Sequence, residues 1–69
     1  MPNDCNLSNA NFFLGDTATP DNLLAACNAA GAKKYRLEVP DGMYNLRTDP
    51  DRIRVLVNER NEIIEIICG

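Results

Sequence analysis

Residues 52–68 read RIRVLVNERNEIIEIIC, and this stretch decides the fold. Its first part alternates Ile53, Val55 and Val57 with Arg52, Arg54 and Leu56, and its last part alternates Ile64, Ile66 and Cys68 with Ile63, Glu65 and Ile67. Alternation of this kind with β-branched residues is typical of strands that bury one face. The polar segment between them, residues 58–61 (NERN), has the length of a hairpin turn. The sequence therefore predicts two antiparallel neighbouring strands.

A helix is expected over residues 20–30, upstream of these strands. Thr19 can cap its first turn with the side-chain oxygen, and Pro20 suits the first helical position. Gly31 can end the helix in a left-handed conformation. The predicted apolar stripe consists of Leu23, Leu24, Cys27 and Ala30, on which Cys27 is a small buried hydrophobic residue. Before the helix, residues 4–14 are expected to form irregular turns that pack Phe12 and Phe13 onto the core.

A further strand is predicted between the helix and the hairpin, where Tyr35, Leu37 and Val39 alternate with Arg36 and Glu38. One helix can cover one face of three such strands. The predicted fold class is therefore α+β: one small two-layer domain over residues 1–69, with one α-helix packed on a short mixed β-sheet. Twelve residues, 40–51 (PDGMYNLRTDPD), connect the first two strands. That length just reaches what a parallel crossover needs, so a parallel pair and an oversized hairpin both stay open.

The connection over residues 40–51 is long, because an ordinary hairpin needs only about 2 to 5 residues. In a small protein such a loop is usually disordered or functional. If Ile53 faces the helix, Arg52 and Arg54 share the opposite face. Their planar guanidiniums can hold carbonyl or carboxylate oxygens of the loop, and Asp41, Asp49 and Asp51 are the nearby carboxylates. The spacing alone equally allows an exposed polar strand face beside a flexible loop.

Composition excludes several classes of protein. The chain has 69 residues, a net charge of −3 and no histidine. A nucleic-acid binder would show a basic stripe, and a membrane span would need about 18 consecutive apolar residues. The sequence contains neither, so both classes are excluded. Without histidine, and with Ser8 as the only serine, we expect no enzyme, metal or cofactor. A core this small usually needs a covalent staple. A bridge between Cys5 and Cys68 would close almost the whole chain, and three free thiols are the alternative.

The order and spacing of these features resemble the potato inhibitor I type of serine protease inhibitors. The resemblance is greatest to the disulfide-bearing fungal elastase inhibitors and their bacterial relatives, and it covers nearly all of the chain. The matching positions are Leu14-Gly15, the helix end at Gly31-Ala32, Pro40, residues 52–55, residues 57–64, and Cys68-Gly69 with an early cysteine at Cys5.

The resemblance implies an inhibitor of subtilisin-, chymotrypsin- or elastase-like serine proteases, whose exposed loop binds the protease as a substrate-like strand. Counting six residues back from Arg52 or six on from Pro40 gives Leu46 as the specificity residue, and Leu46–Arg47 as the scissile bond. The implied protease-binding residues are Tyr44, Asn45, Leu46, Arg47 and Thr48, supported by Arg52 and Arg54. The implied disulfide joins Cys5 to Cys68.

The same resemblance implies a secreted monomer in its mature form, without a signal peptide in this chain. Its partner would be the target protease, with no nucleic acid, membrane or cofactor. One position departs from the family pattern, because the residue after the scissile bond is usually acidic and here is Arg47. The alternative hypothesis is therefore a non-inhibitory protein-interaction module on the same fold.

Overall fold

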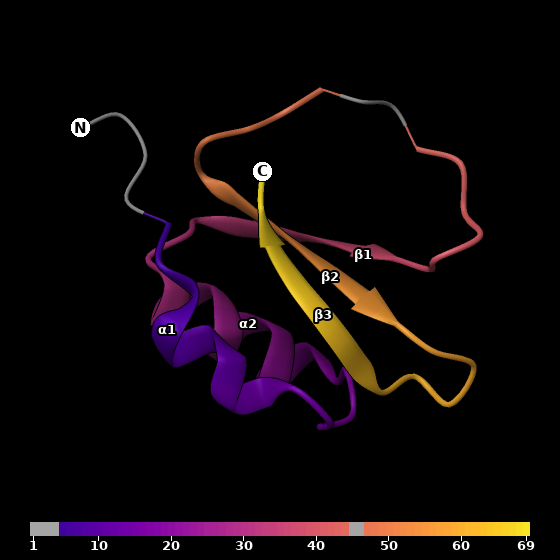
Figure 1. The fold of residues 1–69 in the computed structure, drawn as a ribbon. Coiled ribbons are helices and arrows are strands. Elements are labelled where there is room, and N and C mark those ends of the chain that lie inside the picture. Colours follow the sequence, from indigo (N-terminus) through magenta and orange to yellow (C-terminus); the bar gives the residue numbers. More distant parts are fainter. Residues whose placement is uncertain (1–4, 45–46) are drawn as a thin grey trace.

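A computed structural model describes residues 5–44 and 47–69 of the chain. Helices lie on one side of a three-stranded sheet, which confirms the predicted small two-layer α+β domain (Figure 1). In chain order, the elements are α1 (Leu7–Ala10), a 3-10 helix (Asn11–Phe13), α2 (Pro20–Ala30), β1 (Lys34–Glu38), β2 (Arg52–Val57) and β3 (Ile63–Cys68). None of the helices in the described ranges is long and apolar enough to cross a membrane.

Helix α2 begins and ends where the sequence predicts. The Thr19 hydroxyl oxygen accepts a hydrogen bond from the Asn22 amide at 3.2 Å, and Gly31 ends the helix with φ of 74°. The predicted stripe is wrong at one position, because Leu24 is 56% exposed and Ala26 is buried in its place. Ala26 lies three residues after Leu23 and therefore shares its side of the helix, whereas Leu24 is turned about 100° away.

The sheet has the order β1-β2-β3, in which β1 pairs parallel to β2 and β3 pairs antiparallel to β2. The predicted hairpin is confirmed. Its turn is closed by Asn58, whose side-chain oxygen accepts from the amides of Arg60 and Glu62, both at 2.9 Å. The pairing of the first two strands, which the sequence left open, is parallel, so the loop over residues 40–51 belongs to a crossover.

A register shift changes the buried face of β3. Val57 pairs with Ile63 whereas the preceding Leu56 pairs with Glu65, so Ile64 has no opposite residue. The alternation read from the sequence puts Ile64 on one face with Ile66, but Ile64 is 46% exposed and Ile63 is buried instead. An extra residue in one strand flips the alternation on either side of it. Ile66, beyond the shift, is buried with Ile63.

Strand β1 buries less of its apolar face than predicted. Leu37 and Val39 are 42% and 46% exposed, and Tyr35 is only partly buried against the core. β1 is an edge strand. It starts near the C-terminal end of α2 and runs past the N-terminal end of that helix, so the helix does not cover the last residues of β1 (Figure 1). The buried side chain at this end is Glu38, on the opposite face, with 6% exposure.

The N-terminal segment is more regular than the turns expected from the sequence. α1 contributes the fully buried Ala10, and the 3-10 helix that follows packs Phe13 partly against the core. Phe12 is 81% exposed, so the prediction that both aromatic rings pack inward is wrong for Phe12. A 3-10 helix turns about 120° per residue, which prevents neighbouring side chains from facing the same surface.

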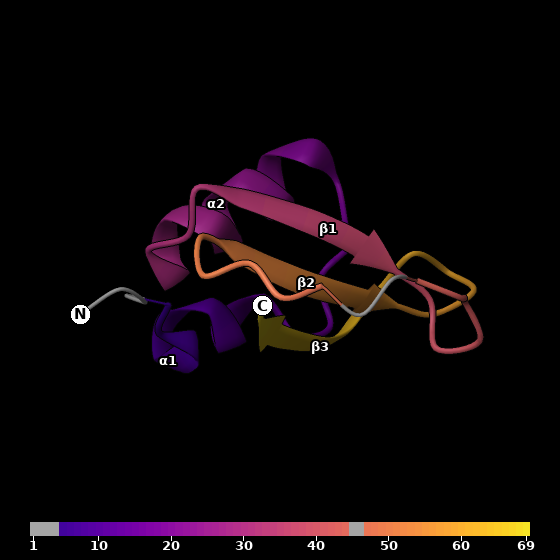
Figure 2. The same ribbon diagram turned by 90° about the horizontal axis from the view of Figure 1, so that it is seen from above.

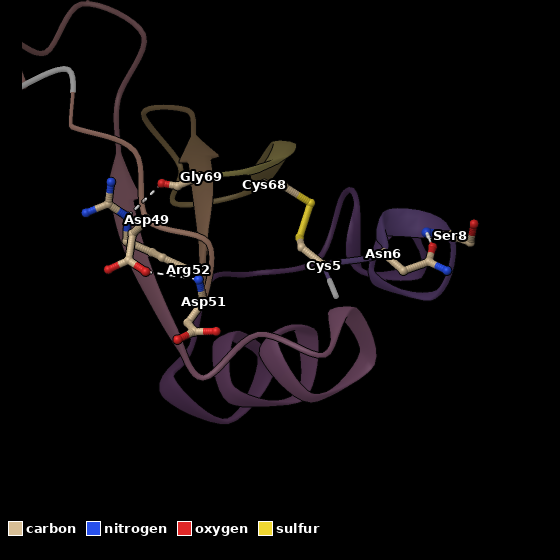
Figure 3. Close-up of a disulfide and its surroundings, with 8 residues drawn as sticks. All are labelled: Cys5, Asn6, Ser8, Asp49, Asp51, Arg52, Cys68 and Gly69. Atoms are coloured by element: carbon tan, nitrogen blue, oxygen red, sulfur yellow. Dashed lines mark hydrogen bonds between the residues drawn. A yellow bond between two sulfur atoms is a disulfide. The ribbon is translucent and has the colours of Figure 1, made fainter. Parts of the chain in front are cut away.

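The cysteines are arranged as expected. Cys5 and Cys68 form a disulfide that joins the start of the described chain to the end of β3 (Figure 3). Cys27 is a free cysteine within the core, together with Leu23, Ile53 and Val55. Burial raises the pKa of the Cys27 thiol, so it stays neutral at pH 7 and packs as a small apolar side chain.

Candidate functional site

The loop crosses the sheet on the face that the helices leave open. Because β1 and β2 are parallel, the chain leaves the end of β1 and must return to the start of β2, and Figure 2 shows the part of the loop that follows residue 46 running back along β2. Tyr44, Arg47 and Thr48 are described and lie on the surface. Two of the implied protease-binding residues, Asn45 and Leu46, fall outside the described residues. The Leu46 side of the expected scissile bond is therefore outside them as well.

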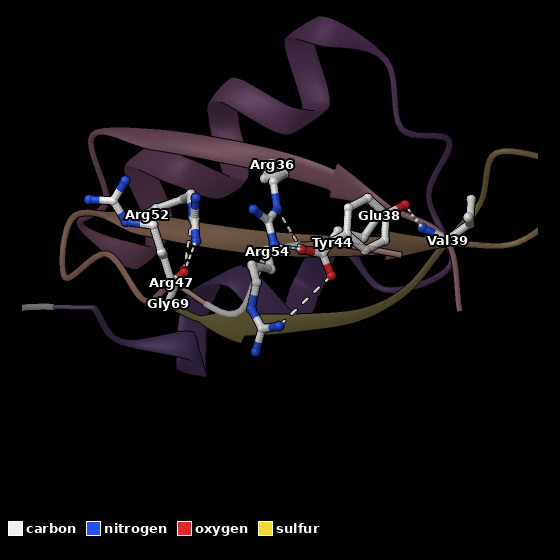
Figure 4. Close-up of polar contacts among 8 residues, drawn as sticks. All are labelled: Arg36, Glu38, Val39, Tyr44, Arg47, Arg52, Arg54 and Gly69. Atoms are coloured by element: carbon white, nitrogen blue, oxygen red, sulfur yellow. Dashed lines mark hydrogen bonds and ion pairs between the residues drawn. The ribbon is translucent and has the colours of Figure 1, made fainter. Parts of the chain in front are cut away.

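Arg52 connects the loop to the end of β3. Its Nη2 donates a hydrogen bond to the main-chain oxygen of Arg47 at 2.8 Å, and its Nε donates to the main-chain oxygen of Gly69 at 2.9 Å (Figure 4). The Gly69 amide donates in turn to the Arg52 carbonyl at 2.8 Å. Arg52 thus holds a carbonyl of the loop from a position that is itself fixed by β3.

Arg54 shares the face of Arg52, as the alternation predicts, but its ion-pair partner among the described residues is Glu38. The distance from Arg54 Nη1 to Glu38 Oε1 is 3.9 Å. Arg36 approaches the other oxygen, with both Nε and Nη2 at 2.7 Å from Glu38 Oε2. Glu38 therefore lies between two guanidiniums that face each other across the parallel pairing of Arg36 with Arg54.

Tyr44 ties the first half of the loop back to the strand it came from. Its hydroxyl oxygen accepts a hydrogen bond from the Val39 amide at 2.8 Å, and Arg36 Cζ lies 5.2 Å from its ring centroid (Figure 4). Gly42 lies under the ring so closely that an added Cβ would come within 2.5 Å of it. A turn closed by the Gly42 amide and the Val39 carbonyl, at 2.9 Å, makes this approach possible.

Asp49 fixes the second half of the loop. Its Oδ2 lies 2.6 Å from Lys34 Nζ, and its Oδ1 accepts from the Asp51 amide at 2.9 Å. The hydrogen bond from Lys34, followed by that from Asp51, lowers the pKa of the Asp49 carboxyl. The Asp51 carbonyl accepts from the amides of Lys33 and Lys34 at 2.7 and 3.1 Å. These contacts bind the end of the loop to the start of β1.

Sequence reasoning missed three side chains of this site, namely Lys34, Arg36 and Glu38. It sought the carboxylates that balance the arginines in the loop, but Asp49 pairs with Lys34 and the carboxylate between arginines comes from β1. The spacing of Arg36 and Glu38 was a usable signal, since residues two apart share a strand face. Their position beside Arg54 depended on the parallel pairing, which the sequence left open.

The arrangement can hold a peptide segment in one conformation for a partner. Side chains from the sheet anchor the loop before residue 45, through Tyr44, and after residue 46, through Arg47, and both of these residues are exposed. Within residues 5–44 and 47–69, no three histidine, cysteine, aspartate or glutamate side chains gather as a metal site would require.

A solved structure with this fold is that of the elastase inhibitor AFUEI (crystal form II). The similarity covers 100% of both chains, with a TM-score of 0.69 and 29% sequence identity. No family model matches the chain, and neither does any curated protein. The match agrees with the resemblance to elastase inhibitors, and membership of the potato inhibitor I type stays a prediction.

Proposed function

We propose that this protein is a secreted inhibitor of serine proteases of the subtilisin, chymotrypsin or elastase type. The loop over residues 40–51 would bind the protease as an extended, substrate-like strand. The observation that carries the proposal is the anchoring of this loop on both sides of residues 45–46 by Tyr44, Arg52 and Lys34. The full-length similarity to a protein named as an elastase inhibitor supports it, and supports a role other than catalysis.

Leu46 is the proposed specificity residue, and Leu46–Arg47 the proposed scissile bond. A leucine side chain fits an apolar specificity pocket, while main-chain pairing of Tyr44, Asn45 and Thr48 with the enzyme would supply affinity. A free peptide loses conformational entropy when it binds, whereas a loop already held in place has lost most of it before binding. Preorganisation would thus convert a substrate sequence into an inhibitor.

Inhibition also requires that cleavage be reversible. When the protease serine oxygen attacks the Leu46 carbonyl carbon, the peptide bond breaks and the amine of Arg47 is the leaving group. The hydrogen bond from Arg52 to the Arg47 carbonyl would keep that amine beside the acyl-enzyme. Attack of the amine on the ester then restores the peptide bond and the free serine faster than water can hydrolyse the ester.

Arg47 bears on the alternative of a non-inhibitory interaction module. Arg52 holds the main-chain carbonyl of Arg47, and a carbonyl is present whatever the side chain. This contact favours the inhibitor over the alternative, because it braces the loop without an acidic residue at position 47. Comparing Arg47→Glu with the native protein separates the two functions. Inhibition found only in Arg47→Glu would favour the interaction module.

The proposal is tested by titrating subtilisin, chymotrypsin and elastase with the native protein, Leu46→Ala and Leu24→Ala. Leu24 is an exposed leucine on α2 and serves as the matched control. We expect inhibition of at least one enzyme, weakened about 30-fold or more in Leu46→Ala, as for a central interface residue. Leu24→Ala should inhibit like the native protein. Absence of inhibition at micromolar concentration, with rapid cleavage after Leu46, would refute the proposal.

A further inference from the structure

A buried carboxylate lies under the first half of the loop. Among the residues that the structure describes, Glu38 is the one charged residue that is buried, and its two oxygens face Arg36 and Arg54. A buried charge is costly unless it is paired and hydrogen-bonded. Glu38 meets that condition through two donors of Arg36, which in turn fix the direction of the Arg36 guanidinium.

The oriented guanidinium of Arg36 faces the ring of Tyr44. The guanidinium carbon lies 5.2 Å from the ring centroid, within the range of a cation–π contact. The same tyrosine accepts a hydrogen bond from the Val39 amide, directly after Glu38 in the chain. We name the set Arg36, Glu38, Tyr44 and the Val39 amide the Tyr44 clasp. It makes three contacts in sequence: the buried carboxylate contacts the arginine, the arginine contacts the loop tyrosine, and the tyrosine accepts from the amide that directly follows β1.

We propose that the Tyr44 clasp is a second positioning device for the protease reaction, acting on the acyl side of the scissile bond. The inference rests on the proposed function. Arg52 holds the leaving side through the Arg47 carbonyl, and the clasp holds Tyr44, two residues before Leu46. Once the Leu46 acyl group is esterified to the protease serine, the clasp keeps the chain before Leu46 bound to the sheet through Tyr44.

This arrangement gives the two sides of the bond separate anchors. Arg52 and Gly69 hold one end from β2 and β3, whereas Arg36 and Glu38 hold the other end from β1. Religation needs both ends at bonding distance at the same time, so loosening either end favours hydrolysis over resynthesis. Arg36 and Glu38 act through Tyr44 and are positioning residues.

The clasp itself can be tested without any protease. Tyr44→Phe removes the hydroxyl acceptor of the Val39 amide and keeps the ring, and Tyr35→Phe, on the core face of β1, is the matched control. We expect amide hydrogen exchange of Val39 to speed up about fivefold or more in Tyr44→Phe, the effect of one hydrogen bond. The Leu23 amide in α2 should exchange at its native rate in both variants. Unchanged exchange at Val39 in Tyr44→Phe would overturn the inference.

The positioning role is tested by forming the complex of the protease with the native protein or with each variant. The rate at which the bound native or variant protein is cleaved is then measured. Tyr44→Phe and Arg36→Gln should be cleaved about fivefold faster, with association rates close to native. Tyr35→Phe should match the native protein, and Arg36→Lys should rescue only in part because it lacks the guanidinium fork. Faster exchange at Val39 without faster cleavage would refute the positioning role. If the native protein inhibits no protease, the proposed function fails and the positioning role falls with it.

Discussion

Asp49 uses both of its carboxylate oxygens to hold the loop, one on Lys34 and the other on the Asp51 amide. Both contacts favour the ionised carboxylate, and they lower its pKa, the Lys34 hydrogen bond most of all. A folded-state pKa below the unfolded value means that stability is present at neutral pH. This stability is lost as the pH falls below about 3.9, the ordinary value, and through the lowered one.

Replacing Asp49 with asparagine should therefore lower the melting temperature at pH 7 by a small amount, since the ion pair is partly exposed. The difference between Asp49→Asn and the native protein should shrink as the pH falls below about 4 and the native carboxylate becomes protonated. Melting curves between pH 2 and pH 7, by circular dichroism, measure it. Asp41→Asn, an exposed aspartate of the same loop, is the control. A difference that stays constant down to pH 2 would contradict the assigned cause.

At the scale of elements, the helix and the hairpin were predictable because their signals are local. Thr19, Pro20 and Gly31 mark the bounds of α2 within the chain itself. The parallel pairing of β1 with β2 depends on residues far apart in sequence, so no local pattern decided it. The register shift at Ile64 was missed for a related reason, because a run of four isoleucines around Glu65 is compatible with either phase of a strand.

The candidate site divides in the same way. Arg52 and Arg54 could be placed on the face opposite the helix, because alternation within β2 settles their direction. The partners of Arg54 and Tyr44 could not be predicted, because Glu38 and Arg36 reach them only when β1 runs parallel beside β2. Local patterns thus placed Arg52 and Arg54, whereas the roles of Arg36 and Glu38 depended on the topology of the sheet.

The N-cap of α2 carries a prediction at this scale. Thr19→Ala removes the oxygen that accepts from the Asn22 amide, and we expect a loss of about 1 kcal/mol in the free energy of unfolding. Urea denaturation measures the loss. Thr17→Ala, an exposed threonine just before the helix, should cost less than about 0.5 kcal/mol. Equal losses in the two variants would show that the cap does not stabilise α2.

Across the whole molecule, the disulfide and the loop are linked through the end of β3. Cys68 pairs with Ile53, and the carbonyl of the next residue, Gly69, accepts a hydrogen bond from Arg52, the residue that also braces the loop (Figure 3). The covalent bond to Cys5 therefore limits the fraying of the strand end on which Arg52 depends. The end of β3 therefore contributes both to the stability of the fold, through the disulfide, and to the order of the loop, through Arg52.

Replacing both Cys5 and Cys68 with serine should lower the free energy of unfolding by about 4 kcal/mol in the chain-entropy model, for a sequence separation of 63 residues. We also expect faster cleavage of the loop by a protease under conditions in which the variant stays folded. Urea denaturation and mass spectrometry of the cleaved product measure the two effects. Cys27→Ala, which leaves the disulfide in place, is the control. Unchanged cleavage in the folded variant would show that Arg52 is held without the disulfide.

The parallel pairing of β1 with β2 also sets a lower limit on the length of the loop. The chain must return from Glu38, opposite Leu56, to Arg52, opposite Lys34, a distance of roughly 13 Å along the strands. A hairpin loop can shrink to about two residues, whereas a parallel crossover needs about a dozen. We therefore expect the fold to tolerate substitutions of loop residues better than a shortening of the loop. A deletion would leave too little chain for the crossover, and we expect it to disrupt the parallel pairing of β1 with β2.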